Sequence, residues 1–166
     1  MTNARRVSLL LALFFIACQA KATAQIPDEI LVDGRVEMLF SEPLNAYLAR
    51  PGNLAKLKPY FAKQRCSGSW RGYKAKWQVR DGRLYLTELD TDPCGDHPKS
   101  VPLESLFMFE AKPVLASWYT GPLVVPQGRM VGYVHMGYES SYERYIVFLV
   151  KEGVVVDRKE STGISK

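Results

Sequence analysis

Short runs of apolar residues alternate with polar residues through most of the chain, and turn-forming residues separate these runs. The segment Tyr73–Arg80 shows the pattern most clearly, with Tyr73, Ala75, Trp77 and Val79 on one face of an extended strand. Lysine, glutamine and arginine side chains fall on the opposite face. Because successive side chains of a strand point to opposite faces of the sheet, this period of two predicts one buried and one solvated face.

Three turns share one form, an acidic residue followed by glycine between two extended runs. They are Asp33-Gly34, Asp81-Gly82 and Glu152-Gly153. Glycine accepts the positive φ that a tight hairpin demands, and aspartate tolerates it next best, so we expect a two-residue hairpin at each pair. At the middle turn, the resulting register places Val79 opposite Leu84 and Trp77 opposite Leu86.

Further strands and a few short helices complete the predicted fold. Strands are expected as a pair over Glu29–Phe40, and at Leu115–Thr120, Leu123–Val125, Met130–Tyr138, Tyr142–Val150 and Val154–Arg158. The run Tyr145–Val150 lacks alternation, which predicts a central strand buried on both faces. Short helices are expected from the Ser41–Leu44 start to Leu48 and over Asn53–Phe61, while Pro102–Phe109 is ambiguous.

These elements predict a single mainly β domain over residues 25–159, built as an antiparallel β-barrel or β-sandwich with a few short helices. Residues 160–166 are expected to form a flexible tail.

Residues 1–24 have the pattern of a secretory signal peptide. Arg5 and Arg6 precede an apolar run, Val7–Ala17, which small residues follow at Ala22–Ala24. This run would span only about 16 Å as a helix, too little to cross a bilayer. We therefore expect export, no transmembrane segment, and a mature chain that begins at Gln25.

Two alternative export routes remain open. Phe15–Cys18 resembles a bacterial lipoprotein box with Phe in place of the usual Leu, so Cys18 is the candidate for lipidation and a lipid anchor. The Arg5-Arg6 pair is also similar to a twin-arginine signal. Both routes, like conventional cleavage, lead to a periplasmic, secreted or membrane-anchored protein.

Removal of the signal peptide changes the charge and the cysteine count. The whole chain carries 22 Lys and Arg against 17 Asp and Glu, and without Arg5, Arg6 and Lys21 the balance becomes 19 against 17. No nucleic-acid partner is expected from so small an excess. Cys66 and Cys94 remain, and in an oxidising compartment we predict a disulfide, with two free buried thiols as the alternative.

Catalytic and metal-binding signatures are mostly missing from the sequence. The stretch Ser67–Gly72 comes nearest to a nucleophile elbow but has Ser where the first Gly should be. His97 with Cys66, or the carboxylates of Asp90, Asp92 and Asp96, are weak candidates for a metal site. We assign no catalytic residue, no metal and no cofactor.

Aromatic residues concentrate in the last third of the chain and supply the candidate binding surface. Its members are Trp118, Tyr119, His135, Tyr138 and Tyr142. Aromatic rings combine apolar area with a polar group and are favoured in binding interfaces. The same rings also fill cores, which is the competing interpretation for Trp118 above all.

Four phrases give the chain a resemblance to a family of bacterial secreted proteins without a known activity. They are Trp70-Arg71-Gly72-Tyr73, Asp81-Gly82-Arg83-Leu84-Tyr85-Leu86, Trp118-Tyr119-Thr120-Gly121 and Tyr133-Val134-His135-Met136-Gly137-Tyr138. The resemblance implies a bacterial source and implies no functional residue.

Three functional hypotheses follow from the sequence. The first is a noncatalytic, disulfide-linked β module of the bacterial envelope that binds another protein or an envelope component, as an inhibitor or immunity protein would. The second is a small-ligand carrier whose strands enclose an aromatic-lined pocket. The third is a hydrolase that uses His135 with Glu139 or Glu143, which would have to converge in one cleft.

Overall fold

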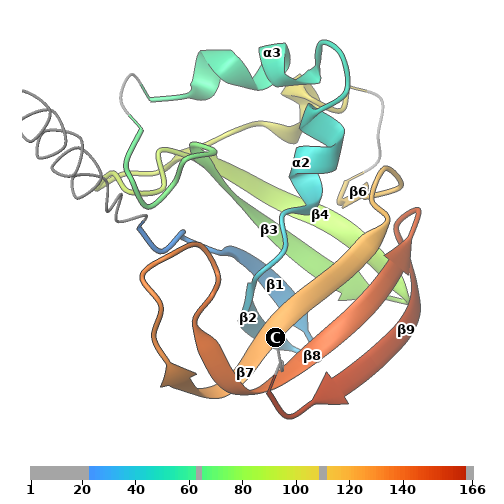
Figure 1. Cartoon of the computed structure of the whole chain (residues 1–166). Helices are drawn as coiled ribbons and strands as arrows, with labels where there is room; N and C mark the ends of the chain where they lie inside the picture. Colours follow the sequence, from blue (N-terminus) through green and yellow to red (C-terminus); the bar gives the residue numbers. More distant parts are fainter. Residues whose placement is uncertain (1–22, 63–64, 109–111, 164–166) are drawn as a thin grey trace, which may run out of the picture.

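The computed structural model describes residues 23–62, 65–108 and 112–163. The predicted signal peptide, apart from Thr23 and Ala24, lies outside the described residues, as do Cys18 and the Arg5-Arg6 pair. Within these ranges the chain is mainly β (Figure 1), which confirms the predicted fold class. The strands are β1 Asp28–Val32, β2 Arg35–Leu39, β3 Tyr73–Arg80, β4 Arg83–Thr91, β5 Lys99–Ser100, β6 Val114–Leu115, β7 Gly121–Gly132, β8 Ser141–Lys151 and β9 Val154–Ser161.

Short helices connect β2 to β3. They are α2 Pro43–Leu48, α3 Asn53–Leu57 and the 3-10 turn η1 Lys58–Tyr60, and a second 3-10 turn, η2, follows at Leu103–Ser105. Pro43 occupies the first turn of α2 as predicted, because its missing N–H would have had no partner there. Across the described ranges, none of the helices is long and apolar enough to span a membrane.

The strands form one curved sheet in the order β2-β1-β3-β4-β9-β8-β7, with β5 and β6 attached to β4. The pairing is antiparallel except between β1 and β3, so the sheet is mixed, and the expectation of a purely antiparallel sheet is corrected at this one pair. The long connection through α2 and α3 returns the chain beside β1 in the same direction, as a parallel pair requires.

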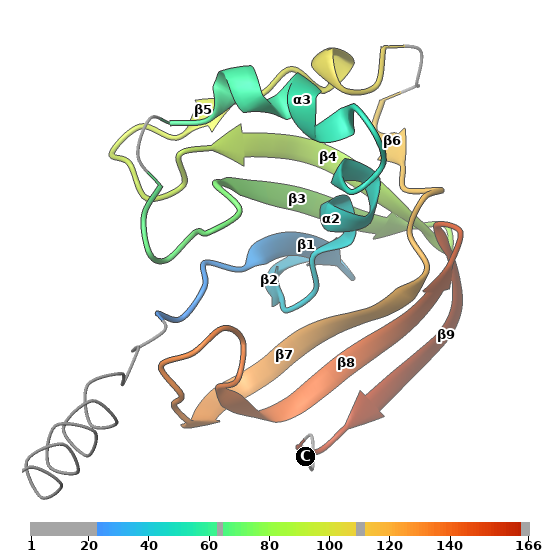
Figure 2. The same ribbon diagram turned by 45° about the horizontal axis from the view of Figure 1, so that its top comes forward.

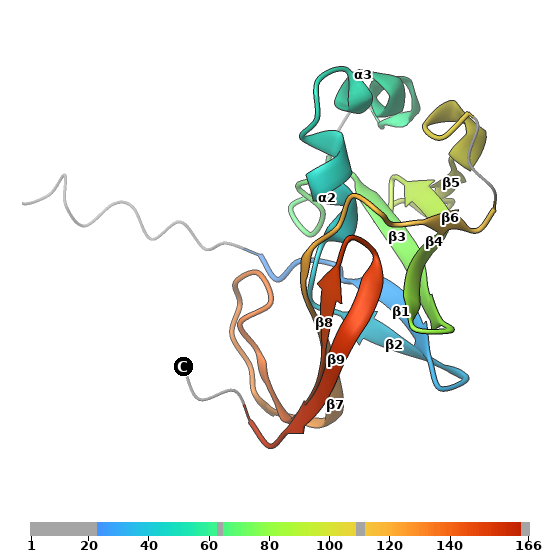
Figure 3. The ribbon, with the colours of Figure 1, turned by 90° about the vertical axis from the view of Figure 1, so that its right-hand side faces the viewer.

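The sheet bends until its two halves face each other, with β1–β4 opposite β7–β9 (Figure 3). The outermost strands meet at one point, where the Phe40 N–H donates to the Val124 carbonyl at 2.8 Å. There Ser41 Oγ also accepts from the Val124 N–H at 3.0 Å and donates to the Pro122 carbonyl at 2.9 Å. No ladder between β2 and β7 closes the sheet in the described residues.

All three acidic-glycine turns form two-residue hairpins. Both residues of each pair have positive φ, for example 51° at Asp81 and 68° at Gly82. Val79 lies opposite Leu84 and Trp77 opposite Leu86, which confirms the predicted register. A register shift follows between Lys76 and Trp77, beyond the region that the turn by itself determines.

The sequence-based division of the region after residue 120 is wrong. A single strand, β7, replaces the two predicted strands at Leu123–Val125 and Met130–Tyr138, and residues 133–140 form a loop (Figure 2). Pro126 stays within the ladder because β7 is an outermost strand, where a missing N–H is tolerated. Gly128, at φ 77°, accommodates a register shift that lets the strand continue.

Two further expectations need correction. Strand β8 lies between β7 and β9 but is not buried on both faces, because the side chain of Leu149 is 37% exposed on the outer side. The strand expected over Leu115–Thr120 ends at Leu115, since the Tyr119 N–H donates to the Ala116 carbonyl and closes a turn. Strand β9 runs to Ser161, two residues into the predicted tail.

The space between the two halves of the sheet is filled by side chains. Trp77, Leu84 and Leu86 come from β3 and β4, and Leu123 and Phe148 come from β7 and β8, all at most 2% exposed. These residues belong to one contiguous cluster. The hydrophobic interior therefore holds the two halves together where ladder pairing between β4 and β9 is limited to Arg83 and Val154.

Candidate functional site

A buried carboxylate on β1 anchors the candidate site. Asp28 lies on the same inward face as Ile30 and is 0% exposed. Its carboxylate accepts hydrogen bonds from the Ala75 N–H and from the Trp77 indole N–H, each at 2.9 Å. Burial raises the pKa of the Asp28 carboxyl, and the Arg71 guanidinium opposes that rise. Asp28 therefore joins β1 to β3 and holds the cation described next.

Arg71 has more hydrogen-bond donors than the protein uses. Its Nη2 donates to the Ile26 carbonyl at 2.9 Å and contacts Asp28 Oδ1 at 2.9 Å, and its side chain is only 7% exposed. In the described part of the chain, Nε and Nη1 have no hydrogen-bond partner. Nη1 lies 3.6 Å from Glu42 Oε1, a distance for an ion pair that is too long for a hydrogen bond.

Unpartnered polar atoms are concentrated at this place. Among the described residues, three buried side-chain nitrogen or oxygen atoms lack a partner, two in Arg71 and the third in Ser69. Leaving a buried donor unpaired costs about 1–3 kcal/mol, and more when it is charged. The fold therefore leaves part of the buried Arg71 guanidinium unpaired within one short loop, and a ligand that displaces a neighbouring side chain could pair it.

An open hollow of about 570 Å³ lies beside Arg71. Its lining consists of Thr23, Gln25, Glu42, Asn45, Trp70, Arg71 and Gly137. These residues come from the segment before β1, the start of α2, the loop before β3 and the loop after β7. Cleavage before Gln25, as the sequence predicts, removes Thr23 from this lining and keeps the other six residues.

Trp70 places a solvent-exposed ring on the lining of the hollow. Its side chain is 68% exposed, whereas its backbone is held at both ends. The Trp70 N–H donates to Gln25 Oε1 at 3.1 Å, and its carbonyl accepts from Arg65 Nη1 at 2.9 Å. Arg65 in turn lies over the Phe61 ring, 4.5 Å from its centroid. The backbone that carries the indole is thus held in place, and the ring is left uncovered.

Glu42 supplies a carboxylate to the lining of the hollow. Its side chain is 27% exposed, and Oε1 accepts from the Tyr138 hydroxyl at 2.9 Å. The Asn45 amide donates to Oε2, and its own oxygen accepts from the Tyr73 hydroxyl at 2.6 Å. Burial raises the pKa of Tyr138, and Glu42, which accepts the hydrogen bond of its hydroxyl, raises that pKa further.

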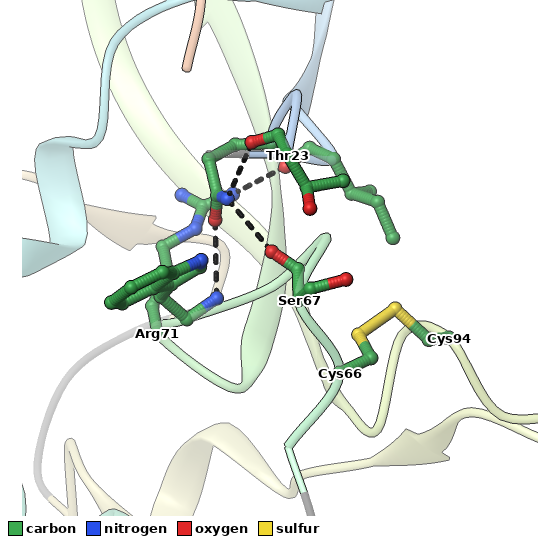
Figure 4. Close-up of a disulfide and its surroundings, with 8 residues drawn as sticks. Thr23, Cys66, Ser67, Arg71 and Cys94 are labelled. Atoms are coloured by element: carbon green, nitrogen blue, oxygen red, sulfur yellow. Dashed lines mark hydrogen bonds between the residues drawn. A yellow bond between two sulfur atoms is a disulfide. The ribbon is translucent and has the colours of Figure 1, made fainter. Parts of the chain in front are cut away.

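The predicted disulfide is present next to this site. Cys66 and Cys94 are bonded across a sequence separation of 28 residues. Figure 4 shows the bond beside the loop that carries Ser67 and Arg71. The Gln25 amide donates to the Ser67 carbonyl at 3.0 Å, so the disulfide and Gln25 hold the same loop. Because Cys66 is in the disulfide, it is not free to share a metal ion with His97.

The structure brings only part of the predicted binding surface to this site. Tyr138 stacks on Phe40 with ring centroids 5.1 Å apart and reaches Glu42. Tyr142 packs edge-on against the same Phe40 ring and is only 8% exposed, so little of it is open to a ligand. Exposed His135 is hydrogen-bonded through Nδ1 to the Tyr133 hydroxyl.

Trp118 and Tyr119 belong to a different region. The indole of Trp118 stacks on Phe107 with centroids 5.1 Å apart and donates to the Pro43 carbonyl. It also borders a second hollow of about 310 Å³ that Arg50 and Lys56 line. The Tyr119 hydroxyl donates to the Pro122 carbonyl. Neither Trp118 nor Tyr119 lines the hollow beside Arg71.

Glu143, one of the two acids considered as a partner for His135, is engaged elsewhere. It accepts from Arg129 Nε at 2.8 Å and from the Arg129 N–H at 3.1 Å. These two bonds lower the pKa of Glu143, the opposite of what a general acid near neutral pH needs.

Several site residues were missed by the sequence analysis, although one signal was present. Asp28 occupies the inward register of β1, in the alternation that continues at Ile30 and Val32. A carboxylate at an apolar position demands a buried partner, and this could have directed attention to an arginine. Neither Arg71, Trp70 nor Glu42 carries a comparable sequence pattern.

Comparisons of the chain with protein-family models, with curated proteins and with solved structures found no match. The roles of the site residues are therefore argued from their geometry and chemistry.

Proposed function

We propose that this protein is a noncatalytic binding module of the bacterial envelope, and that it binds its partner through the hollow beside Arg71. The observation that carries the proposal is the Arg71 guanidinium, which is nearly buried and leaves Nε and Nη1 unpaired next to an exposed tryptophan. Hydrogen bonds from a ligand to these donors would remove the cost of leaving them unpaired and would thereby favour binding.

The packing of the interior favours a surface-binding module over a carrier. A carrier needs room for a ligand between the sheet halves, but Trp77, Leu123 and Phe148 pack there in one buried cluster. The exposed aromatic ring of the site, Trp70, lies on the rim instead. Binding through the rim also suits a partner larger than the hollow, such as an envelope polymer or another protein.

Export is part of the proposal. The predicted signal peptide would direct the chain out of the cytoplasm, and the Cys66–Cys94 bond fits an oxidising compartment. A mature chain that starts at Gln25 would be periplasmic or secreted, whereas cleavage at Cys18 would leave a lipid anchor. The mass of the mature protein separates the two forms.

The test uses two alanine variants of aromatic residues. Trp70→Ala removes the exposed ring at the hollow, and Tyr85→Ala removes a half-buried ring on β4, at the opposite end of β3 and β4 from the site. Each exported protein is immobilised and incubated with envelope extract from the source bacterium, and the retained proteins and cell-wall fragments are quantified. We expect a component that wild type and Tyr85→Ala retain and that Trp70→Ala loses.

Equal retention by Trp70→Ala and wild type would contradict a binding site at the hollow. Circular dichroism of both variants provides the folding control, because a variant with altered secondary structure cannot report on the site.

A further inference from the structure

We propose that the hollow beside Arg71 binds an uncharged, hydroxyl-rich ligand, a saccharide unit, with one face of the sugar ring on Trp70. This inference rests on the proposed binding function and names the class of ligand. It follows from three features of the hollow: the charge balance at Arg71, the mixture of hydrogen-bonding groups, and the exposed indole.

The charge balance disfavours an anion. One guanidinium, that of Arg71, faces two carboxyl groups, Asp28 at 2.9 Å and Glu42 at 3.6 Å. These three side chains together therefore carry no net positive charge, whether or not Asp28 is protonated, and in a mature chain that begins at Gln25 the α-ammonium group adds one positive charge to the lining. A ligand carboxylate or phosphate would approach Arg71 with Glu42 beside it, and like charges at such separations repel each other. A neutral ligand avoids this repulsion.

The hydrogen-bonding groups suit hydroxyls. The unpaired Arg71 Nη1 is buried behind Glu42, 3.6 Å from its Oε1, so a donor and an acceptor meet at one edge of the hollow once Glu42 moves aside. A hydroxyl group can accept from one and donate to the other at the same time, whereas an ammonium group only donates and a carboxylate only accepts. The Glu42 side chain is 27% exposed, so its rotation can admit the ligand to Nη1.

The indole of Trp70 supplies the apolar part of the site. A sugar ring has one face of C–H groups, which gains by covering flat aromatic surface, and hydroxyls around its edge. Trp70 is 68% exposed and its backbone is held by Gln25 and Arg65, so stacking of a ring on it orders only the side-chain torsions of one residue. An aromatic platform beside paired donors and acceptors thus matches both parts of a saccharide.

The experiment follows tryptophan emission during titration with three uncharged oligosaccharides: chitotriose, cellotriose and maltotriose. Choline chloride and sodium acetate serve as a cationic and an anionic probe. Trp77 is 1% exposed, whereas Trp118 is partly buried and borders the second hollow, so a response is assigned to Trp70 only where Trp70→Ala abolishes the blue shift. We expect a blue shift with at least one oligosaccharide, and we expect Trp70→Ala to lack it. By isothermal titration calorimetry, the affinity should be about tenfold weaker in Trp70→Ala and unchanged in Tyr85→Ala.

Glu42→Gln separates the ligand classes further. Because a hydroxyl bonds a carboxylate more strongly than an amide, oligosaccharide affinity should fall about threefold and remain measurable. Binding of a cation should fall by more, because Glu42 is the one carboxylate among the described residues that line the hollow.

The other outcomes overturn the inference in distinguishable ways. A Trp70-dependent response to choline or acetate, with none to the oligosaccharides, would show that the hollow binds ligands but not saccharides. A protein retained from envelope extract in a Trp70-dependent manner, again with no oligosaccharide response, would have the same meaning. If neither the probes nor the extract shows any dependence on Trp70, the proposed binding function fails together with the saccharide inference.

Discussion

The site contains buried charged side chains, and burying them lowers the stability of the fold unless each is paired. Asp28, Arg71 and Glu42 form a chain of charged groups that runs from the interior to the hollow. Breaking a buried ion pair by removing one partner costs about 3–5 kcal/mol, so Asp28 and Arg71 are needed for folding as well as for the site. Trp70 and Glu42, which are exposed or partly exposed, can be changed with less effect on the fold, and they are the better residues for testing function.

The tyrosine next to Glu42 should make stability depend on alkaline pH. Burial raises the pKa of Tyr138 in the folded protein above the ordinary value of about 10. The unfolded chain therefore loses this proton first, so stability is complete below about pH 10 and falls as the pH rises through the interval between the two values. Tyr138→Phe removes this contribution.

Thermal unfolding measured from pH 8 to pH 11 checks this expectation. The free energy of unfolding of each protein is compared with that of the same protein at pH 8. The constant loss of stability from the missing hydrogen bond to Glu42 in Tyr138→Phe then cancels. Above pH 10 the decline in the free energy of unfolding should be shallower in Tyr138→Phe by about 1 kcal/mol per pH unit. Parallel pH profiles for the variant and wild type would show that Tyr138 ionises freely in the folded protein.

At the scale of elements, the hairpin turns were the most predictable feature, and one of them does more than reverse the chain. The β8–β9 turn meets the β3–β4 turn, where the Leu84 N–H donates to the Gly153 carbonyl and the Val155 N–H donates to the Gly82 carbonyl. A Cβ at Gly153 would lie 2.9 Å from the Ala116 backbone. The turn type was readable from two residues, but this contact depends on a third, distant segment.

A matched pair of glycine substitutions tests that contact. Gly153 and Gly34 have nearly equal φ values, 79° and 78°, but Gly34 has open space where a Cβ would go. Gly34→Ala should therefore cost only the backbone strain, about 1 kcal/mol, and Gly153→Ala should cost about 2–3 kcal/mol because Ala116 must also move. Urea denaturation measures both, and equal losses would mean that Ala116 yields without cost.

The prediction of two strands after residue 120 was wrong because the local sequence favours a chain break there, whereas pairing with β8 lets one strand continue. Pro126 and Gly128 together are a turn signal, yet β7 continues through both. Its position at the edge of the sheet decides this, and that position is fixed by the pairing of the whole chain. The prediction that Tyr145–Val150 is buried on both faces was wrong because no second layer covers the outer face of β8, where Leu149 is 37% exposed. The number of layers on a sheet depends on the fold of the whole chain.

At the scale of the whole molecule, the hollow exists because four separate segments meet at one end of the curved sheet. The disulfide lies next to this meeting point and joins the loop before β3 to the loop after β4. It therefore stabilises the domain and positions Trp70 and Arg71, which follow Cys66 by four and five residues.

The double variant Cys66→Ser/Cys94→Ser measures this contribution. Opening a closed loop of 28 residues should lower the free energy of unfolding by about 3.5 kcal/mol and the unfolding midpoint by roughly 10 °C. Wild-type protein reduced under native conditions is the control and should match the variant. Unchanged unfolding after either treatment would mean that packing alone holds this loop.

The sequence by itself determined the β class, the three hairpins, the local register of β3 with β4, and the cysteine pair. Each of these depends on neighbouring residues, on side-chain periodicity, or, for the disulfide, on the fact that only two cysteines remain after residue 24. Only the tertiary structure decided the path of β7, the parallel pairing of β1 with β3, and the site. Asp28, Glu42 and Arg71 lie far apart in the chain, and their common position depends on how the sheet bends, which is set by packing across the whole core.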